Sequence, residues 1–110
     1  MLKANFITAQ EAAEKIQDGS ILCTIGMTLV SASESILKAI EKRFETVGHP
    51  ADITLVHSCG QSDRKDGIQH LAHEGLVKRI VGSHWGLQPR WMEMIANSQV
   101  EAYCLPQGQI

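Results

Sequence analysis

The segment VKRIVGSHWGLQPRWMEMIANSQVEAYCL, residues 77–105, contains two short apolar runs separated by a pattern that indicates a helix. The runs at 77–83 and 99–105 have the length and composition of strands. Pro89 marks the start of a helix that we expect to extend to about Asn97. Strand, helix and strand in this order are typical of a right-handed crossover between two parallel strands.

The same alternation extends toward the amino terminus. Thr8 and Glu11 form a capping box at the start of a helix of about two turns, and Gly48 and Pro50 end a longer amphipathic helix. The expected strands are 20–25, 52–58, 77–83 and 99–105, and the expected helices are 9–16, 33–47, 68–75 and 89–97. We therefore predict an α/β fold with an open, mostly parallel sheet and helices on both faces.

Composition restricts the classes of function. The chain has 110 residues, enough for one small domain, and ten basic against twelve acidic residues give a net charge of -2. This balance provides no basic patch for nucleic acid or for a membrane surface. The apolar runs are shorter than the ~20 residues of a spanning helix, and no signal peptide is recognisable. Cys23, Cys59 and Cys104 form no C-x-x-C motif, so we expect free thiols and a cytoplasmic protein.

Candidate site residues follow the expected strands. In an open parallel sheet, ligands bind just beyond the carboxyl ends of the strands. The candidates there are Gly26 and Met27 after the first strand, Gly60 after the second, His84, Trp85 and Gly86 after the third, and Gln107 and Gly108 after the fourth. Glycine permits close approach of a ligand, but backbone geometry alone also requires it at such turns. Trp85 suits stacking on an aromatic or adenine ring and equally suits a core position, and both interpretations stay open.

Two histidines raise the question of a metal. His70 and His73 lie three residues apart beside Glu74, and a metal would need a third ligand such as His57 or Cys59 from another element. One packed and one solvated histidine explain the pattern without an ion, so we predict no metal site. No Ser/His/Asp order, paired carboxylate, G-x-G-x-x-G or P-loop motif is present to support other catalytic or nucleotide-binding classes.

Residues 70–110, HLAHEGLVKRIVGSHWGLQPRWMEMIANSQVEAYCLPQGQI, strongly resemble the amino-terminal half of family I CoA-transferases, notably the acetate and propionate CoA-transferases of short-chain acyl-CoAs. The combination of HEGLVKR, GSHWG and a following PQG is the specific part of the resemblance. The upstream pieces FITAQEAAEKIQDGSILCT and ILKAIEKRFETVGHPADITLVHSCGQSDRKDGI fit the same family in order and spacing.

The resemblance implies an isomerase/CoA-transferase-type fold, present as one incomplete domain over residues 1–110. It implies transfer of CoA between a short-chain acyl-CoA and a free carboxylate through a glutamyl-CoA intermediate. The nucleophilic glutamate of the family is expected downstream, so the chain itself carries no catalytic nucleophile. By the resemblance, Gln107 is the candidate oxyanion donor, aided by Gly108, Gly26 and Met27, while Gly60, His84, Trp85 and Gly86 line the acyl or CoA pocket.

No resident cofactor is expected, since CoA is a substrate. The expected partners are the acyl-CoA, the carboxylate, and either further copies of the chain or a missing carboxyl-terminal half. The family commonly carries a G-G-F…G-x-P signature after the first strand, where this sequence has Ile25-Gly26-Met27 and Ser31-Ala32-Ser33. Two alternatives stay open: a sugar-phosphate isomerase-like domain, for which only Arg64 and Lys65 offer basic groups, and a non-catalytic domain that binds acyl groups or self-associates.

Overall fold

The computed structural model describes residues 6–25, 34–58, 66–83, 85 and 88–106. Helices and strands alternate along these residues, as the sequence predicts. In chain order the elements are α1 (Ala9–Glu14), β1 (Ile21–Thr24), α2 (Glu34–Val47), β2 (Ile53–His57), the 3-10 helix η1 (Gly67–Leu71), β3 (Val77–Gly82), α3 (Pro89–Ala96) and β4 (Glu101–Cys104).

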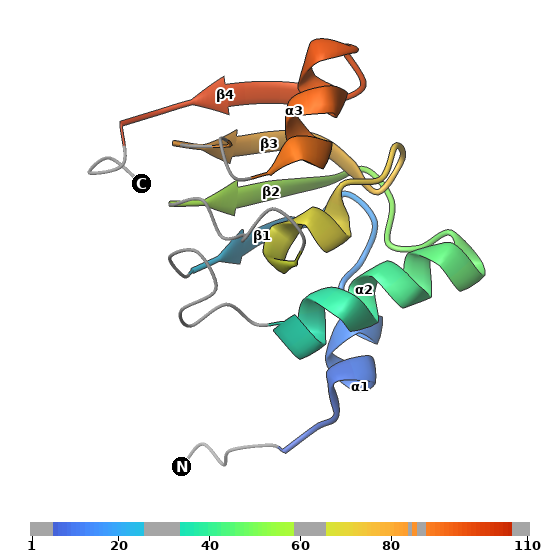
Figure 1. Cartoon of the computed structure of the whole chain (residues 1–110). Coiled ribbons are helices and arrows are strands. Elements are labelled where there is room, and N and C mark those ends of the chain that lie inside the picture. Colours follow the sequence, from blue (N-terminus) through green and yellow to red (C-terminus); the bar gives the residue numbers. More distant parts are fainter. Residues whose placement is uncertain (1–5, 26–33, 59–65, 84, 86–87, 107–110) are drawn as a thin grey trace.

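The four strands form one parallel sheet in the order β1-β2-β3-β4 (Figure 1). The predicted open parallel sheet is therefore confirmed. The predicted helix at 68–75 is shorter than expected, since η1 ends at Leu71. Three residues per turn place Ile68 and Leu71 on the same side of a 3-10 helix, and both are fully buried. One such turn is enough to cover the sheet at this point.

The described helices lie on one face of the sheet (Figure 1). Right-handed crossovers between strands in sequential order put every connecting helix on the same side. The side chains of β2 show the result, because Ile53, Leu55 and His57 are buried whereas Thr54 and Val56 are half-buried. We expected helices on both faces. Within the described residues the strand order never reverses, and a reversal is what would send a crossover to the other face.

The core lies between the sheet and the helices, and Trp91 is the largest side chain that is fully buried within it. Its indole Nε1 donates a hydrogen bond to the Ile68 carbonyl oxygen at 3.0 Å, which joins α3 to η1. The buried Gln69 side chain makes a second link, since its Oε1 accepts from the Arg90 backbone N–H at 3.2 Å. Gln69 thereby satisfies one of the unpaired N–H groups at the start of α3.

None of the helices in the described part of the chain is both long and apolar enough to cross a membrane.

Replacing Trp91 by alanine tests the account of this core. The substitution removes a fully buried indole together with its bond to Ile68, so we expect a loss of about 3–5 kcal/mol in the free energy of unfolding. Urea denaturation measures the difference. The matched control is Met92→Ala in the same helix turn, where the side chain is 52% exposed and the expected change is within about 0.5 kcal/mol. Equal stabilities for the two variants would contradict this packing.

Candidate functional site

The carboxyl ends of the four strands, at Thr24, His57, Gly82 and Cys104, lie along the same edge of the sheet, which we call the carboxyl edge (Figure 1). All eight candidates named from the sequence follow these ends. Of the eight, the structure describes Trp85. The other candidates lie outside the described residues, namely Gly26, Met27, Gly60, His84, Gly86, Gln107 and Gly108.

Trp85 contacts a histidine at the end of the neighbouring central strand. Its indole Nε1 donates a hydrogen bond to His57 Nε2 at 2.9 Å, and the two rings meet edge to face with centroids 5.9 Å apart. The His57 side chain is fully buried, and Trp85 is half-buried against the core. Trp85 is therefore partly packed against the core at the carboxyl edge, which agrees with the core interpretation, while stacking on a ligand ring stays a prediction.

Gly82 is required by the position of His57. A Cβ atom on residue 82 would lie 2.3 Å from His57 Nε2 and 2.5 Å from Cε1, distances that real Cβ atoms do not reach. The imidazole thus occupies the space in which any side chain at position 82 would begin. This gives Gly82 a steric role of its own at the strand end, independent of ligand approach.

Hydrogen bonds also tie the ends of β2, β3 and β4 together. The Ser83 hydroxyl donates to the Ser58 carbonyl oxygen, and the Leu105 backbone N–H donates to the Gly82 carbonyl oxygen at 2.9 Å. The Cys104 thiol adds a weak bond to the Ser83 carbonyl oxygen at 3.6 Å. These contacts fix the points from which the loops after three strands depart, including the segment that leads toward Gln107.

Sequence reasoning missed His57 and Gln88 as residues of this region. The sequence suggests His57 only as a third metal ligand, although its alternation with Ile53 and Leu55 indicates the buried face of the strand. Gln88 precedes α3 and is fully buried, and neither atom of its amide has a hydrogen-bond partner among the residues that the structure describes. Nothing in the sequence pattern distinguished Gln88 from a surface residue beside Pro89.

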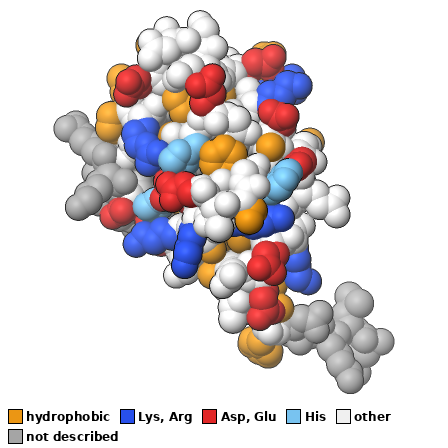
Figure 2. Space-filling view, turned by 90° about the vertical axis from the view of Figure 1, so that its right-hand side faces the viewer, with side chains coloured by type: hydrophobic (Ala, Val, Ile, Leu, Met, Phe, Trp, Pro, Cys, Tyr) orange, Lys and Arg blue, Asp and Glu red, His pale blue; other side chains and the backbone are white. Residues whose placement is uncertain are grey.

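A second polar cluster joins α2 to η1. His70 Nε2 lies 2.5 Å from Glu34 Oε1, and His70 Nδ1 lies 3.1 Å from Glu41 Oε1. His73 Nε2 lies 2.6 Å from the other Glu41 oxygen. Glu74, which sequence reasoning placed with these histidines, instead accepts a hydrogen bond from the Gln99 side chain. Figure 2 shows one face of the molecule, on which histidine side chains lie among acidic and basic ones.

Among the described residues, two groups that include members of this cluster have the side chains of a metal site. Glu34, Asp66 and His70 form one group, and Glu41, Glu45 and His73 form the other, each with its ligand atoms within 4.8 Å of one another. Carboxylate oxygens and imidazole nitrogens are ligands that zinc accepts. These same atoms already form hydrogen bonds and ion pairs between α2 and η1, so their proximity has a structural explanation without an ion.

The cluster changes the acidity of Glu41. Burial by itself would raise the pKa of this carboxyl, but the hydrogen bonds and the electrostatic attraction of His73 and His70 together outweigh it and lower the pKa below its ordinary value of 4.5. A carboxyl with a lowered pKa in the folded state stabilises the fold above its unfolded pKa, and that contribution is lost as the pH falls through the folded value.

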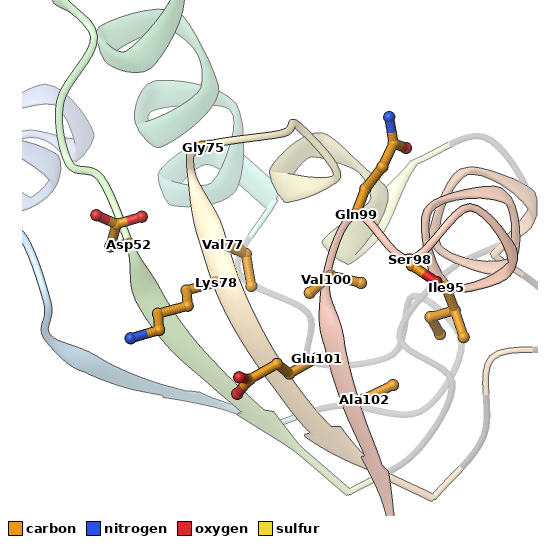
Figure 3. Close-up of a pocket in the computed structure, with 10 residues that line it drawn as sticks. All are labelled: Asp52, Gly75, Val77, Lys78, Ile95, Ser98, Gln99, Val100, Glu101 and Ala102. Carbon is orange, nitrogen blue, oxygen red and sulfur yellow. The ribbon is translucent and has the colours of Figure 1, made fainter.

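A groove of about 540 Å³ lies at the opposite, amino edge of the sheet, where β3 and β4 begin (Figure 3). Lys78 and Glu101 supply charges along it. Ser98 has a φ of 57° and ends α3, and the Gln99 N–H reaches the Met94 carbonyl oxygen at 2.9 Å. This is the geometry of a left-handed helix cap. The groove follows from the way in which α3 ends, and no candidate from the sequence lies in it.

Glu41→Gln tests the linkage between α2 and η1. We expect this variant to lose roughly 1–3 kcal/mol of unfolding free energy near neutral pH, because the charged acceptor for both histidines is removed. The difference from the parent protein should shrink as the pH is lowered below 4.5. Urea denaturation across this pH range measures it. The control is Glu45→Gln on the same helix, since Glu45 is 60% exposed and 3.9 Å from His73. A pH-independent difference for Glu41→Gln would contradict the account.

Chelator treatment tests the expectation that no metal is bound. Because the histidines and carboxylates of the cluster already satisfy one another, EDTA should leave the thermal unfolding temperature of tag-free protein unchanged. Elemental analysis of the same preparation is the second readout. Zinc at one equivalent per chain, with a lower unfolding temperature after chelation, would show that the prediction of no metal site is wrong.

Comparison with known proteins identifies the family. The chain matches the family Coenzyme A transferase over residues 6–110. It is 35% identical to a caffeate CoA-transferase of Acetobacterium woodii over 97% of its own length and 21% of the relative's. It is 34% identical to the acetate CoA-transferase YdiF of Escherichia coli K12, over 93% of this chain and 20% of that protein.

The fold agrees with these matches. A crystal structure of the acyl-CoA transferase YdiF from E. coli O157:H7, in a thioester complex with CoA, superimposes with a TM-score of 0.86 at 32% identity. The superposition covers 93% of this chain and 21% of that one. The chain thus spans about a fifth of the length of the relatives that it matches. By sequence and by fold, it belongs to the Coenzyme A transferase family.

Proposed function

We propose that this chain is the amino-terminal part of an enzyme that transfers CoA between a short-chain acyl-CoA and a free carboxylate. The observation that carries the proposal is the family match over residues 6–110, together with the agreement in fold with a transferase crystallised as a CoA thioester. The same match favours a CoA transferase over the sugar-phosphate isomerase alternative. We further propose a cytoplasmic location.

The names of the relatives support the class of acceptor. One is a transferase for caffeate and another for acetate, and both of these molecules are carboxylates of very different size. What they share is the group that exchanges CoA. We therefore assign the reaction class from the carboxylate and the thioester, and we propose a short-chain acyl group because of the resemblance to the acetate and propionate branch.

The proposed chemistry begins with attack of a glutamate carboxylate on the thioester carbonyl carbon. The tetrahedral intermediate collapses, the C–S bond breaks, and CoA leaves as the thiolate, which gives a mixed anhydride between the acyl group and the glutamate. The thiolate then attacks the glutamyl carbonyl and releases the first carboxylate. A second carboxylate attacks the resulting glutamyl-CoA, and reversal of the steps gives the new acyl-CoA. The glutamate is supplied from beyond residue 110.

Each attack places negative charge on a carbonyl oxygen, so fixed neutral donors beside it lower the barrier. We propose the Gln107 amide for this role, because a neutral amide can donate to the oxyanion without pairing with the nucleophile. Gly108, Gly26 and Met27 are proposed beside it, and Gly60, His84, Trp85 and Gly86 as the pocket lining. No metal or organic cofactor enters this proposal, since CoA is a substrate.

The described residues provide the frame for these groups. The bonds between Ser83 and Ser58 and between Leu105 and Gly82 hold the ends of three strands in fixed register. The proposed donors and pocket residues follow those ends, apart from Gly26 and Met27, which follow β1. We propose that the working enzyme is a homo-oligomer or an assembly of this chain with a carboxyl-terminal half.

Reconstitution tests the proposed role of Gln107. This chain alone should not transfer CoA between acetyl-CoA and propionate, whereas mixing it with the glutamate-bearing carboxyl-terminal half of a family member should give activity. In that assembly Gln107→Ala should raise the barrier by about 2.7–4 kcal/mol, the usual loss for one oxyanion donor. Gln109→Ala, which removes a neighbouring amide, is the matched control and should leave kcat unchanged.

Two results would count against the proposal. A Gln107→Ala assembly with the parent kcat would reduce Gln107 to a turn residue. Robust transfer by the isolated chain would mean that the nucleophile lies within these 110 residues, and the assignment of the glutamate to a downstream segment would then be wrong.

A further inference from the structure

His57 is a polar residue at a core position. It is the last residue of the central strand β2, and its side chain is fully buried on the face covered by the helices. Burying an imidazole costs free energy unless its nitrogens are hydrogen-bonded, and an aliphatic residue would fill the same space without that cost. Its hydrogen-bonding capacity, and not its volume alone, therefore accounts for a histidine at this position.

The bond to Trp85 fixes the state of the ring. An indole N–H can only donate, so His57 Nε2, 2.9 Å away, must accept with its lone pair. A neutral imidazole with an unprotonated Nε2 carries its hydrogen on Nδ1. The interplanar angle of 71° points the edge of one ring at the other, so the contact also defines the tilt of the indole.

Gly82 restricts the His57 ring on one side, and Gln88 holds the Trp85 backbone on the other. The imidazole lies against the backbone of Gly82, where even a methyl group would overlap it, so the ring has no room to move toward β3. On the other side, the Trp85 carbonyl oxygen accepts the Gln88 N–H at 3.0 Å, and the Gln88 carbonyl oxygen accepts the Met92 N–H within α3. Trp85 is thus held between the central strand and the first turn of a helix.

We propose that His57 is a positioning residue, which as the Nδ1–H tautomer holds the half-buried indole of Trp85 at the carboxyl edge for apolar contact with the acyl group of the thioester substrate. His57 does not touch the substrate, because its ring is fully buried behind Trp85 and Gly82. The role of the substrate in this inference rests on the proposed function, whereas the tautomer and the contact rest on the described residues alone.

The contact is tested first on the chain itself, by NMR of 15N-labelled protein. The His57 ring should show a protonated Nδ1 and an unprotonated Nε2, and the Trp85 indole N–H should be protected from solvent exchange. Trp85→Phe keeps an aromatic ring and removes the donor, so it should shift His57 toward a mixture of tautomers. A His57 ring protonated on Nε2 in the parent protein would overturn the inference.

The functional part is tested by kinetics of the assembly with a carboxyl-terminal half. His57→Leu and Trp85→Phe should each raise KM for the acyl-CoA about tenfold with kcat little changed. Each variant weakens a contact that stabilises the bound substrate and the transition state equally. His57→Gln should recover most of the parent KM, since its amide oxygen can replace Nε2 as the acceptor. The double variant should be no worse than either single variant. His49→Leu, at an exposed histidine, is the control.

The outcomes separate the two proposals. If the parent assembly transfers CoA and Trp85→Phe or a folded His57→Leu variant has the parent KM, the positioning role is wrong and the proposed function stands. If the parent assembly transfers no CoA, the proposed function fails and with it the substrate contact. The NMR result then still decides whether His57 positions Trp85.

Discussion

The arrangement of the carboxyl edge depends on the close approach of His57 to Gly82. An imidazole at the end of β2 occupies the volume that a side chain on β3 would need, and only glycine allows both strands to keep their register there. With the imidazole in this place, its Nε2 meets the indole of Trp85. One steric constraint therefore determines the end of the sheet, the buried polar contact and the start of the connection to α3.

The two edges of the sheet differ in their structure. At the carboxyl edge, side-chain and backbone bonds join β2 to β3 and β3 to β4, and the segments that carry the family's motifs extend from them. At the amino edge, the groove of Figure 3 follows from the left-handed cap at Ser98. The cluster of Glu41 with His70 and His73 joins α2 to η1 through a separate set of contacts. Fold stability and the proposed chemistry thus rest on different polar groups.

The sequence predicts the strands well, because short apolar runs bounded by glycine and proline are typical of the buried strands of a parallel sheet. It does not predict that the helices lie on one face, since strand order is a property of the assembled sheet. The sequence likewise does not predict the hydrogen-bond partners of His70, because Glu34 and Glu41 reach the ring only through the packing of α2 on η1. Of the predicted site, the structure describes Trp85, and the role proposed for Gln107 stays a prediction.

The central claim is that an acyl-CoA binds at the carboxyl edge. The most direct measurement is NMR of this chain, isotope-labelled and assembled with an unlabelled carboxyl-terminal half, during titration with a thioether analogue of acyl-CoA that cannot transfer its acyl group. The account predicts that the Trp85 indole N–H and the Ser83 and Leu105 amides shift, while Lys78 and Val100 at the amino edge do not. Shifts confined to Lys78 and Val100, with Trp85 unchanged at saturation, would contradict it.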